Sequence, residues 1–215
     1  MPSPETRFDP LRHPWDAWRP EDVFDRLRGL DVPWHVAAGW SIDLFLGAER
    51  REHEDLEIAA PAVRFHEVAA ALPELEFFAI VDSLAYPVES EPERLEGSHQ
   101  TWGLDRAARV WRVDVFREPS DGDTWVCRRD ESIRFDGGGH IERTADGIPY
   151  GRPELTLLFK AKHARPKDED DLEAVLVVLE PERRRYLGEL LATVHPGHPW
   201  IERCAREDSN PRPTA

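Results

Sequence analysis

The sequence lacks several features that would assign it to a particular class of protein. It has only two cysteines, Cys127 and Cys204, which lie far apart and without C-x-x-C spacing, so cysteine builds no zinc or redox centre here. No apolar run approaches the roughly 20 residues of a membrane span. The amino-terminal region has no apolar core of the secretory kind. These absences predict a cytoplasmic protein without a membrane partner.

An excess of basic residues is also absent. Lys and Arg number 28 against 43 Asp and Glu, and the formal net charge is −15. Sequence-independent binding to long DNA needs a basic face that displaces counterions, so the composition argues against nucleic acid as a partner. The same charge suits a cationic partner, or carboxylates gathered around a metal ion, without establishing either.

The order of the apolar patterns predicts an α+β fold, in which a small mixed β-sheet is flanked by helices and followed by a helical carboxy-terminal segment. Five prolines between positions 1 and 20 deny that stretch a long helix, and we expect an arm on the domain surface anchored by Trp15 and Trp18. The expected parts are the arm at 1–20, an α+β domain at 21–150, the helical segment at 151–205 and a frayed tail at 206–215.

Apolar periodicity also predicts the individual elements. Strands are expected at 34–37, 56–59, 75–81 and 109–116, and around Trp125 and Ile133. Helices are expected at 21–30, at 40–46 with Gly47 as its stop, from Pro61 onward, and three times after position 151.

Three carboxylates stand out on the predicted strands. Asp55 and Glu57 are two positions apart, so their side chains leave the same face of a strand. Neighbouring carboxylates repel each other unless a cation lies between them, and Mg²⁺ is a hard cation that takes oxygen ligands. Asp114, on another strand, is a candidate third ligand or proton acceptor. A solvated pair on an edge strand is the alternative for Asp55 and Glu57 alone.

A glycine precedes this acidic pair at the junction of a strand and a short helix. Gly39 there lets backbone N–H groups approach a phosphate, and the helix amino terminus favours negative charge. Arg51 and His53 lie just before the acidic pair and are candidates to contact the same phosphates. Surface pairing with Glu52 and Glu54 is their alternative role.

Together these residues form a recognisable pattern. The run A-G-W-S-I-D-L-F-L-G at 38–47, followed by R-E-H-E-D-L-E-I-A at 51–59, resembles the nucleotidyltransferase fold of the DNA polymerase β superfamily. It is most similar to the aminoglycoside and lincosamide nucleotidyltransferase branch, whose pattern is G-G-W, an Asp and a Gly in the next helix, then R-x-H-x-D-x-D. The run L-L-F-K-A-K-H-A-R-P-K-D-E-D-D-L-E at 157–173 resembles the helical region that follows in many such proteins.

The resemblance implies an enzyme that transfers a nucleoside monophosphate, usually AMP, from a magnesium-bound NTP to a hydroxyl and releases pyrophosphate. By residue match, Asp55 and Glu57 would bind the metal and Asp114 would be the third carboxylate, while Gly39 would hold the triphosphate. ATP or another NTP would be the co-substrate.

The sequence departs from the family pattern at two positions. Ala38 replaces the first glycine and narrows the freedom of the backbone at the phosphate loop. Glu57 replaces the second Asp of the acidic pair, and its extra methylene must shift either the metal or the strand. Both departures leave open a protein that binds a nucleotide or another ligand without catalysis.

Three lysines complete the candidate site. Lys160, Lys162 and Lys167 are each candidates for the phosphates, although Lys160 and Lys162 are about 200° apart around a helix and cannot both face one ligand. A solvated helix face is their alternative role. The acidic run from Asp168 to Asp171 is interpreted as a helix start that matches the macrodipole, and Asp43 as a hydrogen-bonding support for the loop before Asp55.

The function predicted from the sequence is therefore Mg²⁺-dependent nucleotidyl transfer to a small hydroxylated acceptor, with an aminoglycoside-like cation suited to the acidic charge. A catalytically impaired binding protein on the same fold is one alternative. A nucleotidyltransferase that acts on protein or tRNA is the other.

Overall fold

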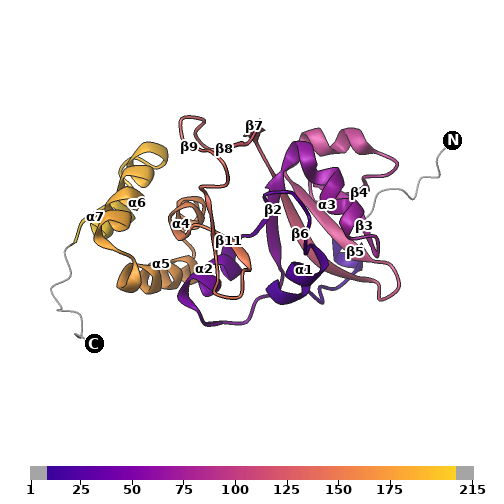
Figure 1. The fold of residues 1–215 in the computed structure, drawn as a ribbon, viewed down its shortest axis with the longest axis horizontal. Helices are drawn as coiled ribbons and strands as arrows, with labels where there is room; N and C mark the ends of the chain where they lie inside the picture. The colour runs from indigo at the N-terminus through magenta and orange to yellow at the C-terminus, as the bar shows by residue number, and fades with distance from the viewer. Residues whose placement is uncertain (1–8, 207–215) are drawn as a thin grey trace. The chain divides into compact units, whose positions relative to one another are not determined.

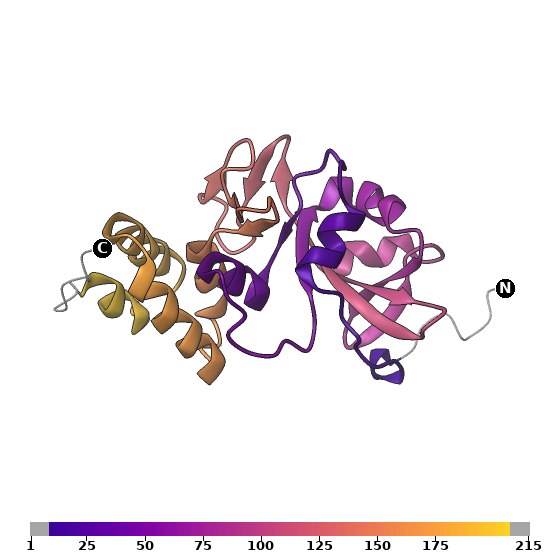
Figure 2. The same cartoon turned by 60° about the horizontal axis from the view of Figure 1, so that its bottom comes forward.

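The computed structural model describes residues 9–206, so residues 1–8 of the expected arm and 207–215 of the expected tail lie outside it. The chain forms two compact units, unit 1 at Met1–Gly151 and unit 2 at Arg152–Ala215. Figures 1 and 2 show strands gathered in the first unit and only helices in the second.

An eight-stranded mixed sheet organises unit 1, with the strand order β10-β11-β1-β2-β6-β5-β3-β4. Strand β1 pairs antiparallel with β2, and β2 pairs parallel with β6. The strands of this sheet are β1 (His35–Val36), β2 (Glu57–Pro61), β3 (Leu75–Val81), β4 (Leu84–Pro87), β5 (Gln100–Asp105), β6 (Val110–Glu118), β10 (Ile141–Arg143) and β11 (Pro149–Gly151). A second sheet consists of β7 (Ser120–Asp121), β8 (Thr124–Val126) and β9 (Arg134–Phe135).

Helices of unit 1 pack on one face of the large sheet, and Figure 1 shows α1 and α3 alongside its strands. Side chains from the helices meet alternate residues of β2 and β6 in one core, among them Ile58 and Val113. The helical elements are η1 (Pro10–Arg12), α1 (Pro20–Arg26), α2 (Ala38–Leu46), η2 (Ala62–Arg64), α3 (Phe65–Ala71) and η3 (Pro92–Gly97). Because side chains alternate along a strand, the residues between these core positions face the other side of the sheet.

The arm is anchored to β6 as expected. Trp15 forms a parallel bridge with Trp111, and its ring lies 5.0 Å from that of Trp102. Backbone hydrogen bonds join Asp16 to Trp111 and Trp18 to Arg112. Trp18 is buried in the main core. Both predicted anchors are thus confirmed.

Unit 2 consists of helices whose apolar faces form its interior. The helices are α4 (Pro153–Lys160), α5 (Pro166–Val178), α6 (Pro181–Val194) and α7 (Trp200–Ala205). Helix α4 contacts both α5 and α6, and α6 contacts α7. Each of the first three helices begins with proline, which fits a helix start because its missing N–H has no partner there. No helix within residues 9–206 has the length and apolar character to cross a membrane.

The predicted α+β class is confirmed, and the two sheets contain more strands than the sequence pattern predicts. The additional strands are β4, β5, β10 and β11 in the large sheet and β7 in the small one. Most are short, and β5 is interrupted by Gly103, where the β5–β6 register shifts. Such segments lack the apolar alternation that reveals a strand. The predicted end of α2 is confirmed, since Gly47 caps it in the left-handed conformation with φ of 73°.

Candidate functional site

The sheet brings two of the predicted carboxylates opposite each other. Glu57 on β2 and Asp114 on β6 are register partners in the parallel pair, so their side chains leave the same face. Their neighbours Ile58 and Val115 point into the helix-covered core instead. Asp55 lies two residues before Glu57, just ahead of β2. Asp114 therefore lies on the same side of the sheet as Glu57, and Asp55 is near enough for its charge to raise the pKa of Asp114.

Asp114 is 2% exposed and only partly satisfied. Gln100 Nε2 donates a hydrogen bond of 2.8 Å to its Oδ2, while its buried Oδ1 has no hydrogen-bond partner. Burial raises the pKa of Asp114 to about 7, against the lowering effect of Gln100 and Trp102, and the charge of Asp55 raises it further. This carboxylate therefore lies in an environment that has too little positive charge for its ionised form.

These features fit a hard cation. Oxygen donors from Asp55, Glu57 and Asp114 are the ligand type that Mg²⁺ takes, and the unpartnered Oδ1 of Asp114 is a lone acceptor in a buried place. Within residues 9–206, no group of three or more His, Cys, Asp or Glu side chains is arranged so that it could hold a metal ion as it stands. The roles of the three carboxylates as ligands stay a prediction.

The first turn of α2 has an unusual backbone. Ala38 has φ of 48°, in the left-handed region that favours glycine. Ala37, the N-cap, provides no side-chain hydrogen bond to the first turn, and Ser41 donates its hydroxyl to the Ala38 carbonyl at 2.9 Å. Ala38, which stands where the family pattern has its first glycine, therefore adopts a conformation that glycine adopts more readily.

Gly39 lies beneath Arg51 and His53. A Cβ atom at Gly39 would lie 2.5 Å from Arg51 Nη2 and 2.8 Å from the His53 ring. The sequence predicts that this glycine gives a phosphate access to the backbone, whereas here the missing side chain makes room for two protein side chains. The structure therefore brings Gly39, Arg51 and His53 together.

His53 is committed to protein contacts. Its Nε2 lies 2.7 Å from Asp43 Oδ2, and both side chains are 3% exposed. Its ring stacks on Trp40 with 4.3 Å between centroids. Burial lowers the pKa of His53, although the hydrogen bond to Asp43 opposes this effect. Asp43 also accepts the Arg50 backbone N–H at 3.2 Å, which confirms its predicted role as a support for this loop.

The lysines lie in unit 2 and have different environments. Lys160 is buried, and its Nζ lies 3.0 Å from Asp168 Oδ1 and 3.0 Å from Asp171 Oδ2. The interpretation of the acidic run as a helix start is confirmed, since Asp168 and Glu169 lie in the first turn of α5. The structure adds that Asp168 and Asp171 are buried against this ammonium. Lys162 lies in a turn after α4, and both it and Lys167 are exposed. Phosphate contact by any of the three lysines stays a prediction.

Two residues near Asp114 escape the sequence pattern. Gln100 and Trp102 lie on β5, and Trp102 is the register partner of Asp114. A hairpin between β5 and β6 would have placed both residues beside Asp114, but the polar and glycine-containing sequence of β5 gives no strand signal.

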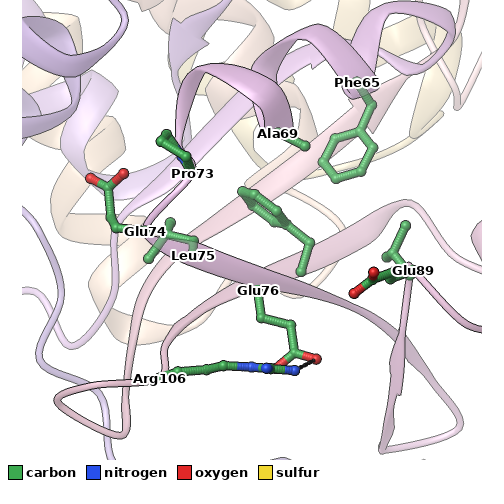
Figure 3. A pocket seen from close by; sticks show the side chains of 10 residues that line it. Phe65, Ala69, Pro73, Glu74, Leu75, Glu76, Glu89 and Arg106 are labelled. Atoms are coloured by element: carbon green, nitrogen blue, oxygen red, sulfur yellow. Dashed lines mark hydrogen bonds and ion pairs between the residues drawn. The ribbon is translucent and has the colours of Figure 1, made fainter.

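A cavity of about 400 Å³ lies elsewhere in unit 1. Figure 3 shows residues of α3 and β3 around it, with Glu74, Glu76 and Glu89 at its edge and Arg106 paired to Glu76. None of the predicted site residues lines this cavity.

The chain is similar to known proteins both in part of its sequence and in its fold. Residues 21–99 match the aminoglycoside-2''-adenylyltransferase family. The solution structure of the antibiotic-resistance factor ANT(2'')-Ia is similar at 14% identity and a TM-score of 0.52, covering 80% of this chain and 87% of that one. No curated protein sequence matches the chain.

Two crystal structures are also similar. ANT(2'')-Ia in complex with adenylyl-2''-tobramycin has 15% identity and a TM-score of 0.55, over 81% of this chain and 93% of that one. The lincomycin-bound lincosamide adenylyltransferase LnuA has 16% identity over 72% of this chain and 92% of that one, and its TM-score of 0.49 carries no weight. The predicted resemblance to this nucleotidyltransferase branch and the nucleotidyltransferase fold are confirmed.

Proposed function

We propose that the chain is a Mg²⁺-dependent nucleotidyltransferase that moves a nucleoside monophosphate, AMP in the first instance, from an NTP to a hydroxyl of a small molecule. The observation that carries this proposal is the register pairing of Glu57 with Asp114 on one face of the sheet, with Asp55 just before β2 and near enough to act on the pKa of Asp114. The match of residues 21–99 to an adenylyltransferase family supports an enzyme of this class.

The carboxylates have distinct tasks in this proposal. Asp55, Glu57 and Asp114 would hold the metal, which when bound neutralises charge on the triphosphate and aligns the attacking and leaving oxygens. Asp114 is in addition suited to accept the proton of the acceptor hydroxyl, because burial brings its pKa to about 7. Gln100 holds the carboxylate in place for either task.

The triphosphate would lie at the amino end of α2. The N-cap residue provides no side-chain acceptor for the first-turn amides, and Arg51 brings a guanidinium to Gly39. Amides at a helix amino terminus together with an arginine provide both the charge and the donors that phosphate oxygens require.

The acceptor in this proposal is a small, cationic, hydroxylated molecule of the aminoglycoside kind. The net charge of −15 favours the approach of a cation. A structural relative was solved with adenylyl-2''-tobramycin, a nucleotidylated compound of this type.

A screen of NTPs against a panel of hydroxylated small molecules, scored by pyrophosphate release, tests the proposal. We expect Mg²⁺-dependent release with at least one acceptor, its loss in Asp55→Asn, and its retention in the control Glu54→Gln, whose side chain is exposed. Calorimetry with a nonhydrolysable ATP analogue, with and without Mg²⁺, separates an enzyme from a binding protein. Binding without turnover across the panel would favour the binding protein, and full turnover by Asp55→Asn would refute the catalytic assignment.

A further inference from the structure

An acid–imidazole pair is buried behind the first turn of α2. Asp43 belongs to the second half of this helix, and His53 belongs to the loop that returns toward β2. Their side chains are 3% exposed and meet at 2.7 Å. Asp43 also accepts the Arg50 backbone N–H, so this carboxylate fixes both ends of the short segment that contains Arg51.

The direction of the hydrogen bonds follows from the arginine. Arg51 Nη1 lies 3.2 Å from His53 Nδ1. A guanidinium only donates, so Nδ1 must accept, and the ring proton must lie on Nε2 facing Asp43. Asp43 therefore selects the tautomer of His53 that can accept from Arg51, and the three side chains form a directed chain.

Packing fixes the ring in this chain. Trp40 stacks on the imidazole with an interplanar angle of 26°, and Gly39 offers no side chain to displace it. The Arg51 guanidinium contacts the same glycine, with Nη2 2.5 Å from where a Cβ would lie. The position of Arg51 at the first turn of α2 thus depends on His53, and that of His53 on Asp43 and Trp40.

We infer that Asp43 and His53 are positioning residues, which hold Arg51 at Gly39 so that its guanidinium meets the pyrophosphate portion of the NTP. This inference rests on the proposed function. The sequence predicts that Arg51 and His53 both contact the phosphates. In this inference only Arg51 contacts the phosphate, and His53 acts by holding Arg51 in place.

Calorimetry on the full chain tests this inference without an acceptor, with magnesium pyrophosphate and AMP as separate probes. His53→Phe keeps a ring on Trp40 but removes both hydrogen bonds. We expect its Kd for pyrophosphate to rise at least about 10-fold and its Kd for AMP to change less than about 2-fold. Arg51→Lys should show the same selective loss. Arg50→Ala is the matched control, since Arg50 contributes its backbone N–H to this network, and its pyrophosphate affinity should stay unchanged.

The double variant distinguishes positioning from direct contact. If His53 acts through Arg51, the pyrophosphate Kd of Arg51→Lys/His53→Phe equals that of Arg51→Lys alone. Fully additive losses, an equal loss for AMP, or a His53→Phe variant with wild-type affinity would overturn the inference while leaving the proposed function intact. A wild-type chain that binds no pyrophosphate would overturn both the inference and the triphosphate assignment. Thermal unfolding of each variant shows whether a loss of pyrophosphate affinity reflects misfolding. If His53→Phe misfolds, the pyrophosphate Kd of Asp43→Asn is measured instead, since this variant retains an acceptor oxygen for the His53 Nε2–H.

Discussion

Glu57 and Asp114 are register partners on the parallel strands β2 and β6, and they bring two carboxylates from distant parts of the sequence to the same face of the sheet. Backbone pairing fixes the distance between their Cα atoms. If one side chain is shortened or lengthened, a bound cation or the other carboxylate must therefore change its position.

Replacement of Glu57 tests this relationship. We expect Glu57→Gln to lower kcat for nucleotidyl transfer by about 100-fold or more, because a neutral amide is a poor magnesium ligand. Glu57→Asp should keep Mg²⁺-dependent turnover. Steady-state kinetics over a range of Mg²⁺ concentrations, with removal of metal by EDTA, measures both effects. The control is Glu52→Gln, whose exposed side chain should be dispensable, and a Glu57→Gln variant with wild-type kcat would contradict the expectation.

The backbone at Ala38 predicts a stabilising substitution. A non-glycine residue in the left-handed region costs about 1–2 kcal/mol, and the greater freedom of glycine in the unfolded chain offsets part of this. With φ of 48° at this position, Ala38→Gly should raise the free energy of unfolding by about 1 kcal/mol.

Ala37→Gly is the control for this substitution. Ala37 has φ of −116°, where glycine brings no relief and should destabilise by about 0.5–1 kcal/mol. Denaturant unfolding of both variants gives the comparison, and a shift of the same sign in the two would show that strain at Ala38 is not the cause.

Two buried histidines predict a loss of stability in acid. His35 and His140 lie with ring centroids 5.2 Å apart. Burial, with a contribution from the charge of His140, lowers the pKa of His35 from 6.5 to about 3. Burial lowers that of His140 to about 4. The unfolded chain takes up protons below about pH 6.5 while the folded chain does not. Stability is therefore fully present above pH 6.5 and falls as the pH drops toward 4, by about 2 kcal/mol per histidine at pH 5.

The His140→Phe variant isolates this effect. Its ring can still stack on Trp125, and the fall in unfolding free energy between pH 7 and pH 5 should be smaller than in the wild type by about 2 kcal/mol. Denaturant unfolding at the two pH values measures it. His66→Gln, at an exposed position of α3, should leave the wild-type pH dependence unaltered; an identical slope in His140→Phe would be incompatible with a neutral buried imidazole.

Lys160 predicts the largest effect on unit 2. Lys160→Met leaves the buried Asp168 and Asp171 without their ammonium and should cost about 3–5 kcal/mol. Hydrogen exchange of peptides from α4 and α5 reports this loss. Lys162→Met removes an exposed ammonium and should change exchange little. Equal protection in the two variants would mean that the buried pair contributes nothing.

The part of the carboxylate arrangement that the sequence predicts has a local origin. Alternation along one strand is enough to place Asp55 and Glu57 together, and the block from Ala38 to Gly47 is distinctive enough to indicate the fold. Whether Asp114 joins them depends on the β2–β6 register, which pairs segments far apart in the chain. No local pattern encodes that register.

The burial of a charged side chain cannot be predicted from the sequence where its partner belongs to another element. Asp168 lies in an acidic run at a helix start, which in one dimension is indistinguishable from a solvated one. It is buried against Lys160 from α4, in addition to its local hydrogen bonds from Arg165. In the same way, the need for glycine at position 39 comes from two side chains that arrive from the following loop.

The attachment of the arm to β6 determines when this segment can fold. Trp111 Nε1 donates to the Pro10 carbonyl, and the arm backbone pairs with Trp111 and Arg112, about a hundred positions later in the chain. During translation the arm emerges from the ribosome before β6, at a time when its partners Trp111 and Arg112 have not been synthesised. The arm therefore has no partner strand until β6 has been synthesised, so the docking of Trp15 and Trp18 follows the synthesis of about half of the chain.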